Sequence, residues 1–204
     1  MSSSDIRADL RNVADMVKDG SRVLDVGCGD GDLLKYLVRE KKVDGRGVEM
    51  RKSRVNTCVS EGLSVIQGDA DTDLVQYPDK SFDYAILSLT LQATRNPRAV
   101  LEELVRIADH AIVSLPNFGH WRVRLMLLFG GRMPVTSTLP DSWWSTQNIH
   151  FCTIQDFVDL SKDMDLQIEQ ALALDRNGKP ISDGLGQMAN LFGETGVFRL
   201  SRKG

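Results

Sequence analysis

The 204-residue chain has few cysteines, few histidines and no excess of positive charge, and each shortage narrows what it can be. Its cysteines, Cys28, Cys58 and Cys152, are odd in number and lack the paired spacing of a disulfide framework or a zinc site. The three histidines are also scattered, so we expect no metal site. A net charge of −3 gives no basic face for nucleic acid. A reduced, cytoplasmic setting is favoured.

Long apolar runs are missing as well. The densest apolar run, residues 125–129, is far too short to cross a membrane, and residues 1–5 lack the basic and apolar regions of a signal peptide. Hydrophobic residues make up 42% of the chain, which is ordinary for a globular protein. This length suffices for one core and is short for two, so we expect a single domain over residues 1–204.

Glycine, by contrast, is concentrated where it is informative. Residues 23–31 read as a buried strand, a turn with three glycines at alternate positions, and the start of an amphipathic helix. Such a turn holds nucleotide-like ligands in doubly wound sheets. A dinucleotide fingerprint would place its third glycine at position 32, which here is Asp32. The observed pattern resembles the first motif of class I S-adenosylmethionine-dependent methyltransferases: Asp25-x-Gly27-x-Gly29-x-Gly31.

Three later segments follow at the spacing of that resemblance. Residues 45–49 end in Glu49, an acceptor suited to ribose hydroxyls. Residues 63–71 form a strand ending in Gly-Asp-Ala, and the resemblance implies that Asp69 faces the adenine amino group. Residues 81–88 match the fourth strand. The resemblance therefore implies a site for S-adenosylmethionine or S-adenosylhomocysteine built from Asp25, Gly27, Cys28, Gly29, Gly31, Glu49, Met50, Asp69, Ala70 and Ser88.

The alternation of strands and helices predicts an α/β fold, with a doubly wound, mostly parallel sheet of seven strands. Asn96-Pro97 predicts one helix start, and Thr153 with Asp156 predicts a capping box at another. Residues 167–174 and 197–202 are expected to be the sixth and seventh strands, as an antiparallel, hairpin-like edge. An N-terminal helix ending near Gly20 either covers the sheet or closes over the cofactor.

Residues 116–152 depart from this alternation and predict an aromatic-rich insertion, or lid, after strand five. The insertion holds all three tryptophans, Trp121, Trp143 and Trp144. They suit a small hydrophobic cluster, a substrate lid, or a docking surface for another protein. Residues 126–129 similarly suit a lid helix or an apolar patch that needs a partner.

A catalytic base is hard to find in the chain. Residues 85–94, one usual place for it in methyltransferases, contain no Asp, Glu, His, Lys or Cys, and Gln92 is their one large polar side chain. The insertion offers His120 and His150 as candidate bases, although His150 would equally satisfy a backbone group in a loop. Three aspartates are expected to be solvated loop residues rather than metal ligands: Asp71, Asp73 and Asp79.

Two phrases narrow the resemblance further. Leu-Pro-Asn-Phe-Gly-His-Trp at 115–121 and Asn-Ile-His-Phe-Cys-Thr at 148–153, with residues 88–92 and 143–147, resemble the methionine-biosynthesis MetW family. That resemblance implies an accessory or regulatory protein that acts with homoserine O-acyltransferase. An active methyltransferase on a small molecule is the alternative, and a structural partner with a vestigial pocket is a third.

Overall fold

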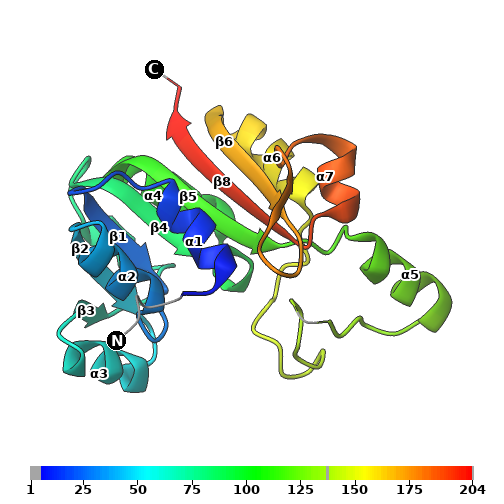
Figure 1. Cartoon of the computed structure of the whole chain (residues 1–204), viewed down its shortest axis with the longest axis horizontal. Coiled ribbons are helices and arrows are strands. Elements are labelled where there is room, and N and C mark those ends of the chain that lie inside the picture. The colour runs from blue at the N-terminus through cyan, green and yellow to red at the C-terminus, as the bar shows by residue number, and fades with distance from the viewer. Residues whose placement is uncertain (1–5, 137, 204) are drawn as a thin grey trace.

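The computed structural model describes residues 6–136 and 138–203, and its central element is one sheet of eight strands (Figure 1). Five strands run parallel in the order β3-β2-β1-β4-β5, and three more continue the sheet antiparallel in the order β8-β6-β7. Their bounds are β1 (Arg22–Val26), β2 (Asp44–Glu49), β3 (Ser64–Gln67), β4 (Phe82–Ser88), β5 (Ala108–Pro116), β6 (Leu166–Leu174), β7 (Pro180–Ser182) and β8 (Thr195–Arg202).

Helices cover both faces because successive strand residues point to opposite sides. Within β1, Val23 packs with the helices of one face and Leu24 with those of the other. The first face carries α1 (Ala8–Asp15), α2 (Asp32–Glu40) and α3 (Lys52–Ser60). The second carries α4 (Pro97–Ile107), α6 (Ile154–Asp163) and α7 (Gly186–Phe192), and two short 3₁₀ turns are η1 (Leu74–Gln76) and η2 (Leu91–Ala93).

The predicted helix starts are confirmed in their hydrogen bonds. The Asn96 side chain accepts from the N–H of Ala99 at 3.2 Å, with Pro97 at the first helical position. Thr153 and Asp156 form the reciprocal capping box of α6, at 2.9 and 3.1 Å. These local bonds satisfy donors that a helix start otherwise leaves unpaired.

The fold class is confirmed, but the expected number of strands is wrong by one. The additional strand is β7, which has three residues, begins with a proline, and pairs with the outer side of β6. A segment this short shows no periodicity, and proline is tolerated there because the strand is at the edge. The predicted sixth and seventh strands are antiparallel as expected, but β8 lies between β5 and β6, so the edge is β7.

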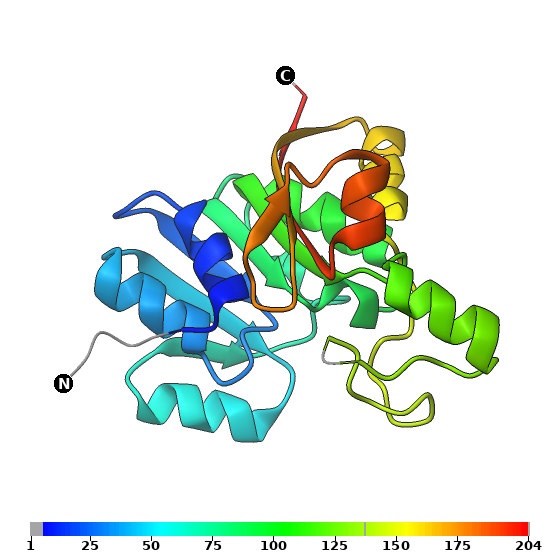
Figure 2. The same ribbon diagram turned by 45° about the vertical axis from the view of Figure 1, so that its right-hand side comes forward.

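In the expected insertion, residues 116–152, Pro116 still belongs to β5, and the one helix among the described residues is α5 (Trp121–Gly130), which extends away from the sheet at the end of the molecule beyond β5 (Figures 1 and 2). Val123 is the one buried residue of this helix. The chain then runs without helix or strand through the described residues up to α6. No helix in the described ranges is both long and apolar enough to cross a membrane.

Candidate functional site

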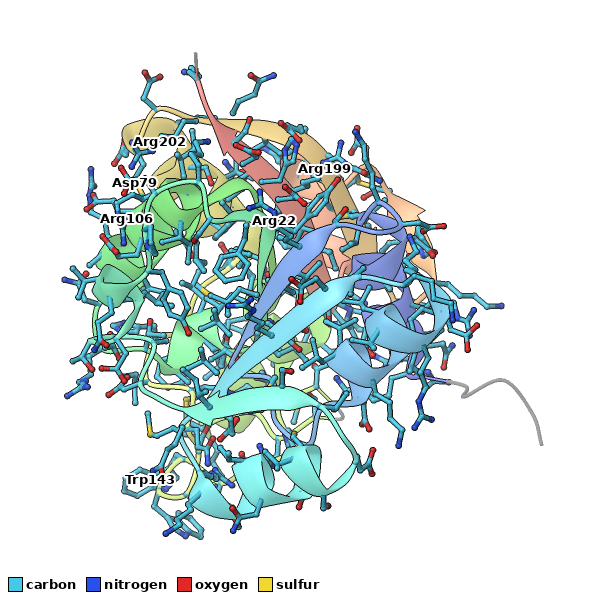
Figure 3. The ribbon with its side chains drawn as sticks, turned by 90° about the vertical axis from the view of Figure 1, so that its left-hand side faces the viewer. Arg22, Asp79, Arg106, Trp143, Arg199 and Arg202 are labelled. Carbon is cyan, nitrogen blue, oxygen red and sulfur yellow. The ribbon has the colours of Figure 1, made fainter. Side chains whose placement is uncertain are left out.

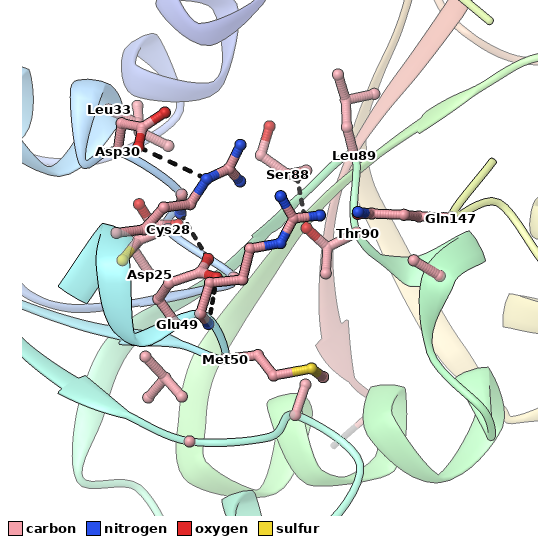
Figure 4. Close-up of a pocket in the computed structure, with 18 of the residues that line it drawn as sticks. Asp25, Cys28, Asp30, Leu33, Glu49, Met50, Ser88, Leu89, Thr90 and Gln147 are labelled. Carbon is pink, nitrogen blue, oxygen red and sulfur yellow. Dashed lines mark hydrogen bonds and ion pairs between the residues drawn. The ribbon is translucent and has the colours of Figure 1, made fainter. Parts of the chain in front are cut away.

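A pocket of about 510 Å³ opens at the carboxyl ends of β1, β2, β3 and β4 (Figure 4). The strand order reverses between β1 and β4, and open α/β sheets bind ligands at such a reversal. Nine of the ten residues expected to bind the cofactor line this pocket. They are Asp25, Gly27, Cys28, Gly29, Glu49, Met50, Asp69, Ala70 and Ser88.

The glycine turn forms one wall of the pocket. Gly27 and Cys28 donate their N–H groups to the Val48 carbonyl at 2.7 and 3.1 Å, which fixes the turn against the end of β2. Gly27 has φ +70°, and a Cβ there would lie 2.9 Å from the side chain of Thr90. The turn therefore requires glycine both for its backbone conformation and for its close approach to the loop after β4, residues 89–94, which we call the β4 loop.

Gly31, the tenth expected residue, does not line the pocket. It is the N-cap of α2 with φ +84°, and a Cβ there would meet Leu63 at 2.7 Å and Cys58 at 2.9 Å. This glycine lets α3 and the chain after it pack against the start of α2. Its role is to shape the turn.

Glu49 is held by backbone donors on both carboxylate oxygens. Oε2 accepts from the N–H of Gly29 at 3.0 Å, and Oε1 accepts from the N–H of Arg51 at 2.8 Å. The side chain is buried and joins the glycine turn to the end of β2. Each oxygen retains acceptor capacity for a ligand hydroxyl, so the structural role and the expected ribose role are compatible.

Asp25 has the opposite character. It is 2% exposed, and no donor in the described part of the chain hydrogen-bonds its carboxylate. Burial, and secondarily the nearby Glu49 charge, raise the pKa of Asp25 to about 7. A carboxylate with no internal partner at the floor of a pocket favours a cationic ligand group, because an unpaired buried charge is costly.

The remaining expected residues lie around the rim. The Asp69 carboxylate pairs with the Arg95 guanidinium and accepts the N–H of Asp71 at 2.9 Å. Met50 is 60% exposed beside the opening. Ser88 ends β4 with its hydroxyl 3.0 Å from that of Ser114.

The three aspartates of the loops bind protein groups. Asp71 accepts the N–H groups of Arg95 and Asn96 at 2.9 to 3.0 Å, and Asp73 accepts the N–H of Asp69 at 2.8 Å. Asp79 pairs with Arg106, on the side of the molecule that faces the viewer in Figure 3. Among the described residues no group of three or more His, Cys, Asp or Glu could hold a metal ion.

Several lining residues lie outside the sequence motifs. Arg54 pairs with Asp30 at 3.6 Å beside the glycine turn, and Gln147 reaches the pocket from the insertion (Figure 4). These contributions come from chain segments that meet only in the folded molecule. The other lining residues that were not among the expected cofactor-binding residues, several of them inside the motifs, are Arg7, Leu10, Asp30, Asp32, Leu33, Val48, Arg51, Gly68, Asp71, Leu89, Thr90, Ala93 and Thr94.

Neither candidate base lines the pocket. His120 is the N-cap of α5, where its Nδ1 accepts the N–H of Arg122 at 3.3 Å, and burial lowers its pKa. His150 donates its backbone N–H to the Gln92 carbonyl at 3.0 Å, and its Nε2 is buried without a hydrogen-bond partner in the described chain. The geometry gives His120 a structural function and leaves one nitrogen of His150 unassigned.

Gln92, noted above as the one large polar residue of its loop, joins that loop to the insertion. Its side-chain N–H₂ donates to Leu89 O at 2.7 Å and to Asn148 Oδ1 at 3.1 Å. The main-chain carbonyl of Gln92 accepts the N–H groups of both Ile149 and His150 at 3.0 Å. The loop position where methyltransferases often carry a base here carries a structural connection.

Comparison with known proteins gives a match to the methionine biosynthesis protein MetW family over residues 7–200. The chain belongs to this family. One MetW relative, the bifunctional methionine biosynthesis protein MetXA/MetW of Rhodopirellula baltica, is 32% identical over 179 residues. That match covers 83% of this chain and 29% of the relative, so the chain spans less than a third of the larger protein.

Solved structures show the methyltransferase fold of this MetW-family chain. A SAM-dependent methyltransferase from Thermotoga maritima superposes with a TM-score of 0.68 at 19% identity, covering 96% of this chain and 88% of that one. The [4+2]-cyclase SpnF superposes with a TM-score of 0.67 at 15% identity, covering 98% and 85%. Neighbours named for such different reactions show that the fold alone does not fix the chemistry.

Proposed function

We propose that the chain binds S-adenosylmethionine, or its demethylated product S-adenosylhomocysteine, in the pocket at the ends of β1–β4. The observation that carries the proposal is the buried Asp25 carboxylate, which has no hydrogen-bond donor in the part of the chain that the structure describes. Both ligands carry an α-ammonium that this carboxylate would neutralise. Glu49 would accept ribose hydroxyls, Asp69 would accept the adenine amino group, and Met50 would pack on the adenine, while Gly27, Cys28, Gly29, Ala70 and Ser88 would line the site and Gly31 would shape the turn.

We further propose that the protein acts in methionine biosynthesis as an accessory subunit of homoserine O-acyltransferase. The supporting observation is the Rhodopirellula relative, in which MetXA and MetW are parts of one chain. A second support is the β4 loop, where Gln92 makes structural bonds and no ionisable side chain is present.

The identity of the ligand suggests how the acyltransferase would be regulated. S-adenosylmethionine is made from methionine, so a subunit that binds it would report that methionine is sufficient. Control of the acyltransferase requires that the ligand bind the free subunit and the complex with different affinities, and the ratio of those affinities sets the range of control. Equal ligand affinities for the free subunit and the complex would rule out this regulation.

The test is the rate of homoserine acyl transfer by the purified acyltransferase of the same organism, with and without this protein and with and without S-adenosylmethionine. We expect a stable complex on size exclusion and a rate that changes when the protein is added. An unchanged rate and no complex would reject the accessory role. Calorimetry with S-adenosylmethionine on the isolated chain tests the ligand proposal separately.

A second candidate function is methyl transfer to a small molecule, with His120 or His150 as the base. The observation in its favour is the buried, unpartnered Nε2 of His150, which has an unused bonding position. Bound S-adenosylmethionine would supply an activated methyl group, leaving the protein to position an acceptor and to remove its proton. Turnover that survives His120→Gln and His150→Gln together would remove both histidines from this role.

A further inference from the structure

Helix α5 has apolar side chains on all of its faces, interrupted by two arginines, and yet it is exposed. Of its ten residues, eight are apolar or glycine, and Val123 alone is buried. Leu128 is 73% exposed and Phe129 is 80% exposed. A helix that is hydrophobic on every side is ordinarily buried in a larger protein, so the described part of this chain leaves α5 without its expected cover.

The exposed apolar side chains continue through the insertion. Among the described residues, twelve of the twenty exposed large hydrophobic side chains lie between residues 121 and 151. Trp143 and Trp144 are 70% and 74% exposed and meet edge to face at 5.7 Å. Trp143 lies at the margin of the molecule in Figure 3, and Figures 1 and 2 both place α5 and the chain after it at one end. We call these twelve side chains the insertion surface: Trp121, Leu125, Met126, Leu127, Leu128, Phe129, Met133, Val135, Trp143, Trp144, Ile149 and Phe151.

Positive charge predominates beside the helical part of this surface. Between Asn117 and Pro140 the chain has three arginines, at positions 122, 124 and 132, and no acidic residue. The acidic groups nearby are Asp141, two residues before Trp143, and Glu194, which lies 4.0 Å from the Arg122 guanidinium. Arg122 lies over the Trp121 ring, 5.3 Å from its centroid. Tryptophan and arginine are the residue types that dominate binding energy at protein interfaces. A partner with an apolar patch and an acidic rim would complement this arrangement.

We infer that the insertion surface is where the acyltransferase docks, an inference that rests on the proposed accessory function. The occupant is argued from the Rhodopirellula relative, whose single chain joins the MetW part to a larger MetXA part. Tethering makes those two parts permanent neighbours at high effective concentration, which suits an apolar helix that needs constant cover. A second copy of this chain suits it less well, because it would bring arginine-bordered surfaces together.

The insertion surface is connected to the ligand pocket. Gln147 lines the pocket, and Asn148, Ile149 and His150 are hydrogen-bonded to Gln92 in the loop after β4, which also lines the pocket. Trp144 lies three residues before Gln147, and the side chain of Ile149 is itself part of the surface. A docked acyltransferase would therefore contact the same short segment that contributes Gln147 to the pocket.

The experiment compares three full-length variants with the wild type in binding to the purified acyltransferase. Leu128→Asp with Phe129→Asp charges the tip of α5, and Trp143→Ser with Trp144→Ser empties the tryptophan pair. Val75→Asp is the matched control, since Val75 is 68% exposed but belongs to η1. We expect both surface variants to weaken binding at least thirtyfold. We expect the control, and S-adenosylmethionine binding by all three, to stay within twofold of wild type.

The outcomes separate this inference from the proposed function. Wild type that binds the acyltransferase, with both surface variants binding equally well, overturns the docking site and leaves the accessory role intact. Wild type that does not bind rejects the accessory role and the inference with it. A wild-type dimer that both surface variants convert to monomer assigns the surface to a second copy and overturns the inference. Retained S-adenosylmethionine binding shows that a variant is folded.

Discussion

The pocket and the insertion differ in the kind of group that each leaves without a partner. Around the pocket, Glu49 and the N–H groups of Gly27, Cys28 and Gly29 are hydrogen-bonded within the protein, whereas the buried Asp25 carboxylate has no hydrogen-bond donor among the described residues. In the insertion, large apolar side chains face solvent. The pocket would be complemented by one small cationic group. The insertion would be complemented by a large apolar surface on another molecule. The difference indicates two kinds of partner, a metabolite and a protein.

Removing the charge from the pocket should have the largest effect. Asp25→Asn keeps the shape but eliminates the carboxylate, so we expect S-adenosylmethionine affinity to fall about 100-fold, the typical value of a charge-assisted bond inside a protein. The measurement is titration calorimetry at pH 8. Affinity within threefold of wild type would contradict the assigned role of Asp25.

The same variant should gain stability without ligand. A pKa of about 7 in the folded protein lies above the ordinary value of 3.8, so the folded state holds the proton more tightly than the unfolded state. The stabilisation is complete below about pH 4 and is lost as the pH rises through about 7. At pH 8 we expect Asp25→Asn to raise the free energy of unfolding by on the order of 1–3 kcal/mol, measured by urea denaturation. A less stable variant would show that Asp25 has a partner after all.

Adding a Cβ where the glycine turn contacts the β4 loop should have the next largest effect. Gly27→Ala places a Cβ 2.9 Å from Thr90 at φ +70°, whereas Gly20→Ala introduces it at φ +73° with nothing within 4 Å. Both variants bear the backbone cost of about 1 kcal/mol, and only Gly27→Ala should also weaken ligand binding, by about tenfold or more. Equal ligand affinities in the two variants, measured by calorimetry, would show that the contact with Thr90 does not shape the site.

The pH dependence of ligand binding should be smaller and opposite in sign to that of stability. The ligand ammonium requires ionised Asp25, and a pKa of about 7 leaves most of the carboxylate protonated at pH 6. We expect affinity to rise about tenfold from pH 6 to pH 8 in calorimetric titrations. Asp25→Asn is the control, because it should bind weakly and equally at both pH values.

The smallest expected effect tests whether the two regions communicate. Asn148→Ala removes the 3.1 Å bond from Gln92 but leaves the backbone bonds of residues 149 and 150 in place. We expect the ligand to change acyltransferase affinity in the wild type, and the variant to reduce that change a few-fold while each separate affinity is nearly retained. The measurement is acyltransferase binding at zero and saturating S-adenosylmethionine, and an unaltered ratio would exclude this route.

The sequence predicted the pocket where short motifs determine it and failed where distant segments meet. Asp25, Gly27 and Glu49 lie at or directly after the carboxyl ends of β1 and β2, and parallel strands bring these ends to one edge, so the motif order is sufficient to group them. Gln147 is more than fifty residues along the chain from the lining residues of the β4 loop, and nothing in its local sequence indicates that it lines the same pocket.

The histidines show a different limit. A histidine before a helix satisfies the spacing of a catalytic base as well as that of a cap, and only the ring position distinguishes them. In the folded chain the Nδ1 of His120 accepts a backbone N–H of α5. The sequence allows three alternatives for the tryptophans for the same reason, since an aromatic cluster and a docking surface have the same composition and differ in exposure.

The position of β8 has a consequence for how the protein is made. Every other strand precedes it in the chain, yet it lies inside the sheet between β5 and β6. During synthesis, β5 and β6 therefore wait with unpaired edges until residues 195–202 leave the ribosome, and such edges invite pairing with other chains. A nascent chain halted before β8 would therefore leave β5 and β6 each without the strand that pairs with it in the folded sheet.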